Sequence, residues 1–590
     1  MSQPQQPQFD LKNMVMAVAV SLLIVFGWQY YYAIPAAKKA QEAAAQQAQT
    51  AQVATTAASE VKDRAAVISA TKRIKIDTPA VSGSINLTGA QLDDLQLNKY
   101  RETVAQDSPL ITLLSPSGSK DAYYVVQSFA AVGDAAVKTP GQATEWQAPE
   151  GAVLKQDAPV TLTWDNGQGL QFSREISVSD EYLFTIKDTV KNTGTQPVGL
   201  QPVSIVQRED TPKIGGYSTF YEGPLGLQNG GRQEFTYAKL KKDPKTVNQV
   251  SATGGWVGFT DKYWSTVAIP DQASKVTAFY NFIEIPGRDG YKTGYRVDDV
   301  LTVQPGASAS YESHVYAGAK VVNTLNAIGS KYKIDNFNMM IDWGWFWFIT
   351  QPMFKLLSLV HGLVGNFGIA IMIVTVLVKA VVFPLANRSY ASMSKMKNLK
   401  PQMDAIKELY PDDRARQQQE TMELYKREKV NPMAGCLPIF VQIPIFFSLY
   451  KVILITIELR QAPFFGWIHD LSVPDPTSIF NLFGLLPFQP PAALLIGFWP
   501  LLMGITMWVQ MRLNPAPPDP VQAQMFNWMP VIFTYSMSGF PAGLTIYWAW
   551  SNFLSIVQQS YIMKKHGTEL DLFGNIRDSL PFLKKKPAAT

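Results

Sequence analysis

An apolar stretch that contains a lysine, Phe367 to Pro384, constrains this chain more than any other feature. Its sequence, FGIAIMIVTVLVKAVVFP, is long and apolar enough to enter a bilayer, yet Lys379 lies deep inside it. A lysine within a span costs at least ~2.5–3.5 kcal/mol on insertion scales and usually has a functional reason. Thr375, four residues earlier, shares its helical face. Lys379 is therefore a candidate site residue, with snorkelling of its ammonium to the headgroups as the alternative.

Composition divides the 590 residues into two unlike halves, a polar one before residue 335 and a second one that holds most of the long apolar runs. One cysteine, Cys436, excludes an intramolecular disulfide. The four histidines, His314, His361, His469 and His566, are too scattered to predict a zinc site. We therefore expect no metal and no cofactor. The net charge of +5 is small, so the position of the charges matters more than their sum.

The N-terminal residues 1–35 predict an uncleaved transmembrane anchor. The apolar run MVMAVAVSLLIVFGWQYYY, Met14 to Tyr32, is about long enough for one span and ends in aromatic residues typical of a membrane interface. A cleaved signal peptide is the alternative, but the run is long and the residues before it are barely basic. Residues 36–72 are rich in Ala, Gln and Thr and predict a flexible linker.

Residues 73–335 predict an all-β domain. Apolar and polar residues alternate in stretches such as Val160/Leu162/Trp164, and the segment DNGQG at 165–169 turns the chain into the next such stretch. Many short strands without sustained helical periodicity favour an antiparallel sandwich. We find no paired catalytic constellation here, and a lone histidine in a strand is more often structural than catalytic. The sequence therefore predicts that the chain is not an enzyme.

Residues 336–366 predict an amphipathic helix that lies in the membrane interface. Three tryptophans open the segment, and the polar residues Gln351, Lys355, Ser358 and His361 then recur at helical spacing. The opposite face is predicted to carry Met353, Phe354, Leu356, Leu357, Leu359 and Val360.

Residues 388–431 follow the lysine-containing span and predict a basic helical hairpin. Apolar residues three and four apart, Met396 to Tyr410, would form its seam. We expect Pro401 to kink the first arm and the segment YPDD at 410–413 to form the turn. The charges fit either a solvated surface or a docking site for a partner.

Four further apolar runs, 437–457, 492–511, 523–540 and 542–563, complete a predicted membrane region at 367–563. The hairpin and the tail 564–590 are rich in Lys and Arg, whereas the loops at 462–491 and around 540 have no basic cluster. By the positive-inside rule the hairpin and both termini face the cytoplasm and the β-domain lies outside. Six spans satisfy this alternation.

Polar side chains recur on at least four of these spans. They are Thr375, Lys379, Gln442, Thr506, Gln510, Asn552, Ser555 and Gln559. Hydrogen bonding between helices would explain most of them, but it does not explain a lysine without a carboxylate. No Asp or Glu lies well inside an apolar run, so water in a polar cavity is the expected solvent for Lys379. The lack of intramembrane acids disfavours a proton-coupled transporter, and no glycine–lysine loop predicts a nucleotide site.

Several motifs resemble the YidC/Oxa family of membrane protein insertases, of the Gram-negative type with a large periplasmic domain. They are EKVNPMAGCLPIFVQIPIFFSLY (428–450), ELRQAPFFGWIHDLSVPDP (458–476), MPVIFTY (529–535) and FPAGLTIYWAWSN (540–552). The resemblance implies an α-helical membrane protein with six transmembrane helices, five of them forming the insertase core. It also implies an all-β periplasmic supersandwich related to sugar-mutarotase folds, whose activity we do not transfer.

The resemblance also implies a site. The family has a positive residue, usually arginine, in a water-filled groove open to the cytoplasm and to lipid, and Lys379 occupies that position. Gln442 matches a groove glutamine, and Tyr547 lies in the last-span signature. Lysine keeps the charge but lacks the planar fork of arginine, which disfavours a mechanism that needs bidentate contacts.

The function that the resemblance implies is insertion and folding of bacterial inner-membrane proteins, alone or with the Sec translocon, by a chain whose residues 36–366 are periplasmic. Expected partners are nascent membrane proteins, the Sec translocon, the ribosome through the basic hairpin and tail, and anionic lipids. Two alternatives are a polar-groove channel or transporter and an envelope scaffold protein.

Overall fold

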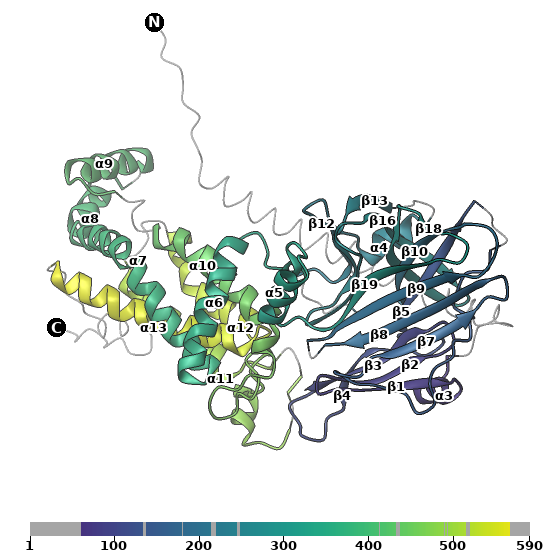
Figure 1. Ribbon diagram of the computed structural model, residues 1–590. Helices are drawn as coiled ribbons and strands as arrows, with labels where there is room; N and C mark the ends of the chain where they lie inside the picture. Colours follow the sequence, from purple (N-terminus) through teal and green to yellow (C-terminus); the bar gives the residue numbers. More distant parts are fainter. Residues whose placement is uncertain are drawn as a thin grey trace, which may run out of the picture.

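A computed structural model describes residues 61–133, 137–179, 181–213, 220–244, 248–411, 413–431, 437–488, 490–491, 494–514 and 520–566. The predicted anchor at 1–35, linker residues 36–60 and the tail beyond 566 lie outside the described residues. A β-sheet domain and a helical part lie side by side, and the pair of helices α8 and α9 projects from the end of the helical part far from the sheets (Figure 1).

Two large sheets form the β-domain, as the alternating pattern predicts. In the described residues, the first contains β1 (Arg73–Asp77), β2 (Val81–Asn86), β3 (Gln91–Arg101), β4 (Leu110–Leu114), β5 (Tyr123–Val132), β6 (Val153–Leu154), β10 (Val198–Glu209), β13 (Asn248–Thr253), β16 (Lys275–Ile285), β17 (Arg288–Val297) and β18 (Leu301–Val303). The second contains β7 (Val160–Asp165), β8 (Leu170–Val178), β9 (Leu183–Asn192), β11 (Gly223–Gln228), β12 (Gly231–Glu234), β14 (Trp256–Thr260), β15 (Trp264–Ile269) and β19 (Ser308–Ala319). The pairing is antiparallel except between β1 and β6.

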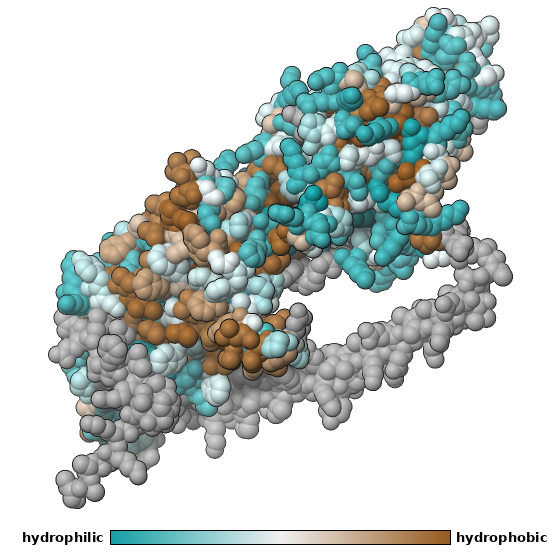
Figure 2. Space-filling model, turned by 90° about the horizontal axis from the view of Figure 1, so that it is seen from below, coloured by the Kyte–Doolittle hydropathy of each residue, from teal (hydrophilic) through white to brown (hydrophobic). Residues whose placement is uncertain are grey.

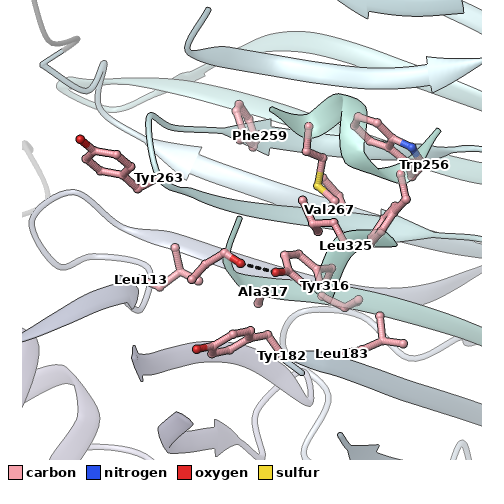
Figure 3. Packing of buried hydrophobic residues seen from close by; sticks show 14 of the residues in the cluster. Leu113, Tyr182, Leu183, Trp256, Phe259, Tyr263, Val267, Tyr316, Ala317 and Leu325 are labelled. Atoms are coloured by element: carbon pink, nitrogen blue, oxygen red, sulfur yellow. Dashed lines mark hydrogen bonds between the residues drawn. The ribbon is translucent and has the colours of Figure 1, made fainter. Parts of the chain in front are cut away.

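The alternation of apolar and polar residues in the sequence corresponds to alternate burial along the strands. Along β8, Leu170, Phe172, Ile176 and Val178 are buried and the residues between them mostly are not. The predicted turn between β7 and β8 forms, and the Asn166 side chain stabilises it by accepting hydrogen bonds from backbone N–H groups. The buried face packs an aromatic cluster, in which the Tyr316 hydroxyl donates to the Ala319 carbonyl (Figure 3).

Among the residues that the structure describes, four short helical segments accompany the sheets. They are α3 (Arg64–Ser69), α4 (Tyr237–Lys242), α5 (Val322–Lys331) and the 3-10 turn η2 (Phe337–Met340). Leu325 of α5 is fully buried in the same cluster as the strand residues (Figure 3). Helix α5 therefore belongs to the core of the β-domain, although it stands next to the helical part (Figure 1).

A buried lysine, Lys320, directly follows the last strand, β19, and precedes α5. Its side chain is 3% exposed and donates hydrogen bonds to Thr260 Oγ1 (2.9 Å) and to the carbonyls of Met340 (3.3 Å) and Asp261. Burial lowers the pKa of Lys320 to about 7, although the nearby Asp261 carboxylate opposes this shift.

This burial predicts a pH dependence of stability. Because the folded-state pKa lies below that of the unfolded chain, unfolding takes up a proton between about pH 7 and 10, and the free energy of unfolding rises with pH across that window. Lys320→Met should reduce the slope by up to about 1.4 kcal/mol per pH unit, measured by urea unfolding of the β-domain at pH 7, 8 and 9. Some pH dependence of stability should remain in this variant, because burial also lowers the pKa of Lys262, to about 8. The exposed control Lys75→Met should leave it unchanged.

The helical part follows the order expected from the apolar runs. It consists of α6 (Trp347–Val364), α7 (Phe367–Asn398), α8 (Lys400–Leu409), α9 (Arg414–Arg427), α10 (Leu437–Ile455), η4 (Ile457–Leu459), η5 (Ile479–Gly484), α11 (Phe498–Leu513), α12 (Pro520–Met537) and α13 (Ala542–Lys565). By length and composition, α7 is the one described helix fit to cross a membrane, and Phe440–Ile455 is a shorter apolar stretch. Apolar surface gathers over the helical part and hydrophilic surface over the β-domain (Figure 2).

The segment 336–366 contains a helix over the predicted amphipathic stretch, and part of its apolar face is exposed. The helix α6 occupies only its second half, and Met353, Phe354, Leu357 and Val360 are buried as expected. Leu359, which belongs to the same predicted apolar face, is 65% exposed. Trp347, Phe348, Leu359 and Leu363 are more than half exposed, so the outward side of α6 is largely apolar apart from Lys355.

The hairpin at 388–431 differs from the sequence prediction in two details. Helix α7 runs without interruption through Pro384 to Asn398, so its end supplies the first part of the expected hairpin. Pro401 does not kink an arm; it lies in the first turn of α8, where its missing N–H costs nothing. The predicted seam forms, with Leu399 packed on Leu424 of α9.

Polar contacts join the β-domain to the helical part. The carboxylate of Asp342 pairs with Lys451 Nζ of α10 at 2.8 Å. Glu458 Oε1 accepts a hydrogen bond from the N–H of Val322 at the start of α5 (3.0 Å), which satisfies one of that helix's free N–H groups. Arg460 donates to the carbonyl of Arg101 at 2.6 Å. These contacts hold the β-domain at one end of the bundle.

Candidate functional site

A stripe of side chains along α7 forms one wall of the site. Helix α7 begins at Asn366, whose side chain caps the first turn by accepting from Ile369 N at 3.1 Å. The stripe repeats every three or four residues and therefore stays on one face. It consists of Val374, Thr375, Val378, Lys379, Val382, Ala386 and Tyr390. Lys379 is the charged member of this otherwise mostly apolar wall.

Helices α6, α10 and α13 close the remaining walls of a cavity. Its empty volume is about 560 Å³, part of it open to the outside, and its further lining residues are Met353, Val441, Gln442, Ile445, Leu449, Tyr547 and Gln558. An adjoining cavity of about 340 Å³ is lined by Lys379, Gln442, Phe446, Gln510, Tyr547, Trp548, Ser551, Asn552 and Ser555. Lys379, Gln442 and Tyr547 line both, and we call the two together the groove.

Within the described part of the chain, Lys379 makes one hydrogen bond, from Nζ to Ser555 Oγ of α13 at 2.8 Å. The Ser555 hydroxyl in turn donates to the carbonyl of Ser551 at 2.9 Å. Lys379 is half-buried, and among the described residues no carboxylate lines the groove. An ammonium holds three donor hydrogens, so one serine leaves it with donor capacity for water or for another acceptor.

Gln442 and Tyr547 are paired across the groove. The Gln442 side-chain amide donates to the Tyr547 hydroxyl and so joins α10 to α13. Asn552 lies one turn further along α13, where its amide donates weakly to Thr506 Oγ1 and to the carbonyl of Met503, both at 3.4 Å.

Two predicted site residues, Thr506 and Gln559, lie outside the groove, and a third, Thr375, uses its hydroxyl within its own helix. Thr375 lines it, but its hydroxyl donates to the Ile371 carbonyl of its own helix at 2.6 Å. Thr506 lies behind Asn552 and is not among the lining residues. Gln559 points elsewhere and donates to Asn514 Oδ1 at 2.9 Å. These threonine and glutamine side chains bond within or between helices, as the packing alternative predicted.

Three polar lining residues were missed by the sequence reasoning, namely Tyr390, Ser551 and Gln558. Tyr390 lies eleven residues after Lys379, which is three helical turns and therefore the same face. Because the predicted span ended at Pro384, Tyr390 was not assigned to the helix face of Lys379. Ser551 lies four residues from both Tyr547 and Ser555, a spacing that was visible in the sequence.

Comparison with known proteins covers nearly all of the chain. Residues 73–356 match the family profile "YidC periplasmic domain", and residues 359–569 match "60Kd inner membrane protein". The membrane protein insertase YidC of Beijerinckia indica subsp. indica is 49% identical over 96% of this chain and 98% of that protein. This chain belongs to the YidC family of membrane protein insertases.

A second relative supports this assignment. The insertase of Methylorubrum extorquens is 47% identical over 98% of this chain and 99% of its own length. A crystal structure of an active YidC insertase is similar with a TM-score of 0.33, at 16% identity over 82% of this chain and 92% of that one. Membrane protein insertion is not an enzymatic activity, so family membership confirms the expectation that the chain is not an enzyme.

Proposed function

We propose that this chain inserts membrane proteins into the bacterial inner membrane by giving their polar segments a hydrated path beside Lys379. The proposal rests on the surroundings of Lys379. Among the described residues its ammonium donates a single hydrogen bond, to Ser555, and no carboxylate lines the groove. The remaining donors of the ammonium are then available to an acidic or polar segment of a nascent protein.

The groove would lower the free-energy cost of moving a polar segment of the substrate into the membrane, because the segment would not have to enter hydrocarbon unpaired. Each unsatisfied backbone group or charge costs several kcal/mol there. In the groove, Lys379, Gln442 and Asn552 replace part of the lost hydration. The apolar segment of the substrate can then move into lipid beside α10 and α12, whose outward residues Phe440 and Val531 are well exposed.

Six spans with both termini in the cytoplasm remain part of this proposal. The spans would be the predicted anchor within 1–35 together with α7, α10, α11, α12 and α13. Helices α10, α11 and α13 carry the polar residues Gln442, Gln510 and Asn552 where they line the groove. The position of the hairpin α8–α9 at the end opposite the β-domain supports a cytoplasmic hairpin and a periplasmic β-domain (Figure 1).

The expected partners follow from the surfaces at the two ends. Lys407, Lys426 and Arg427 are exposed on the hairpin, which supports contact with the ribosome or with anionic lipids. Nascent membrane proteins are the substrates that this function requires. Cooperation with the Sec translocon is proposed from family membership and is independent of the groove geometry.

Reconstitution separates an insertase from a channel. Liposomes that contain only this chain should insert a short two-span protein, scored by protease protection, and should not release a trapped fluorescent solute faster than empty liposomes. Solute release without insertion would instead support a channel. An envelope scaffold would show neither activity.

Tyr547→Phe tests the contact across the groove. Removing the hydroxyl leaves the Gln442 amide without this acceptor, but water in the groove can replace it, so insertion should fall only about two- to threefold. Insertion into the same liposomes measures this. The matched control is Tyr561→Phe on the exposed side of α13, which should insert at the normal rate. A loss larger than tenfold would show that the groove is dry at this position.

A further inference from the structure

A loop tip between α10 and α11, residues 479–488, exposes an unusual number of large apolar side chains. They are Phe480, Leu482, Phe483, Leu485, Leu486 and Phe488, each between 40% and 82% exposed. The sequence from 476 to 511 contains no Asp, Glu, Lys or Arg. Since contiguous exposed apolar patches mark interaction sites, the tip is expected to meet an apolar partner.

The tip pairs part of its backbone internally. Asn481 lies at its centre: its carbonyl accepts from Leu486 N (3.0 Å), its side-chain oxygen accepts from Gly484 N (3.0 Å), and its side-chain amide donates to the Phe488 carbonyl (3.2 Å). A segment that enters hydrocarbon must pair its backbone groups internally because no water is available there. The hydrogen bonds of the tip meet this requirement for the groups that they join.

Two bulky residues of the tip adopt a conformation that favours glycine. Leu482 has φ 50° and ψ 48°, and Phe483 has φ 57° and ψ 33°. The left-handed region costs roughly 1–2 kcal/mol for such residues. Strain of this kind persists where the surrounding structure imposes it and is often part of a function. Here it turns two large apolar side chains outward in succession.

The base of the tip is fixed to the helical bundle. Asp475 is 4% exposed and accepts hydrogen bonds from Thr477 N (3.0 Å) and from Trp499 N in the first turn of α11 (3.0 Å). Val473 accepts from Ala542 N at the start of α13 (2.7 Å). The same loop begins beside Arg460, which contacts the β-domain. The tip is therefore held in place on the β-domain side of the bundle.

We propose that residues 479–488 form a wedge inserted among the lipid acyl chains of the leaflet on the β-domain side. Lipid is the occupant that the observations favour, because the exposed Leu494 and Leu495 continue the apolar surface from the tip to Ile505 on the outside of α11. The apolar surface of the molecule also gathers over this helical part (Figure 2). A wedge of uncharged side chains, with part of its backbone paired internally, suits a bilayer interior.

Depth-dependent fluorescence quenching tests the wedge in the full chain. Cys436→Ser removes the one cysteine, and Leu485→Cys then places an NBD label at the tip, where the side chain is 82% exposed and packs little. Matched labels at Ile505→Cys and Glu150→Cys serve as the lipid-facing and water-facing references. The protein is reconstituted into phosphatidylethanolamine–phosphatidylglycerol vesicles containing a lipid with a nitroxide on its acyl chain.

The wedge predicts that nitroxide lipid quenches the label at 485 at least half as strongly as the label at 505. Aqueous iodide should quench the label at 485 about fivefold less than the label at 150. Iodide quenching equal to that at 150 would place the tip in water and overturn the proposal. Quenching by neither agent would mean that protein covers the tip, as in contact with a second copy, and would overturn it too. Because the readout does not measure insertion, the result stands apart from the proposed function.

Discussion

Lys379→Glu should reduce insertion of an acidic two-span substrate into liposomes at least tenfold. The substitution places a carboxylate in a groove whose described lining otherwise carries no charge, and it repels the acidic segment of the substrate. Lys379→Ala removes the attraction without adding repulsion, so its loss should be smaller. Protease protection of the inserted substrate measures both.

Lys379→Arg should remain active, because arginine preserves the positive charge and can still donate to Ser555. The matched control is Lys355→Glu, which makes the same change at an exposed lysine on α6 outside the groove and should retain most of the activity. Unchanged insertion of every tested substrate by Lys379→Glu would rule out an electrostatic role for this lysine. Equal losses in Lys379→Glu and Lys355→Glu would point to a general effect of charge on the fold.

Arg174→Ala should destabilise the β-domain by about 3–5 kcal/mol, the cost of leaving a buried charge without its partner. Arg174 is almost fully buried and binds Asp188 with both Nε (2.7 Å) and Nη2 (3.2 Å), while its guanidinium lies 4.9 Å from the centre of the Trp146 ring. Alanine leaves the Asp188 carboxylate buried and unpaired. Protease susceptibility of the full chain in urea should show a midpoint lowered by on the order of 1 M.

The double substitution Arg174→Met with Asp188→Leu distinguishes a lost charge partner from lost packing. Because both charges are removed and volume is largely kept, it should cost much less than Arg174→Ala. The exposed pair Lys75–Asp77 offers a matched control, and Lys75→Ala should change stability by less than about 1 kcal/mol. A double variant as unstable as the single one would mean that the shape of the arginine, rather than its charge, holds the two strands.

Much of the site was visible in the sequence, because helical spacing fixes which residues share a face. Lys379, Gln442 and Ser555 stand out as polar residues in apolar runs, and the structure brings them together. Tyr547 was identified only through resemblance to the family. Periodicity could not separate these from Thr506 and Gln559, since a polar residue on a helix face looks the same whether it meets a groove or a neighbouring backbone.

The sequence by itself determined the alternating strands of the β-domain, the basic hairpin and the presence of a lysine without an acidic neighbour in its span. These are local properties, set by side-chain periodicity and by the cost of burying a charge. Only the tertiary structure decided that Ser555 receives the Lys379 hydrogen bond, that Glu458 caps α5, and that the apolar loop folds into a self-paired tip. Such contacts join residues far apart in the chain, and they depend on how helices cross and how loops close, which no single segment encodes.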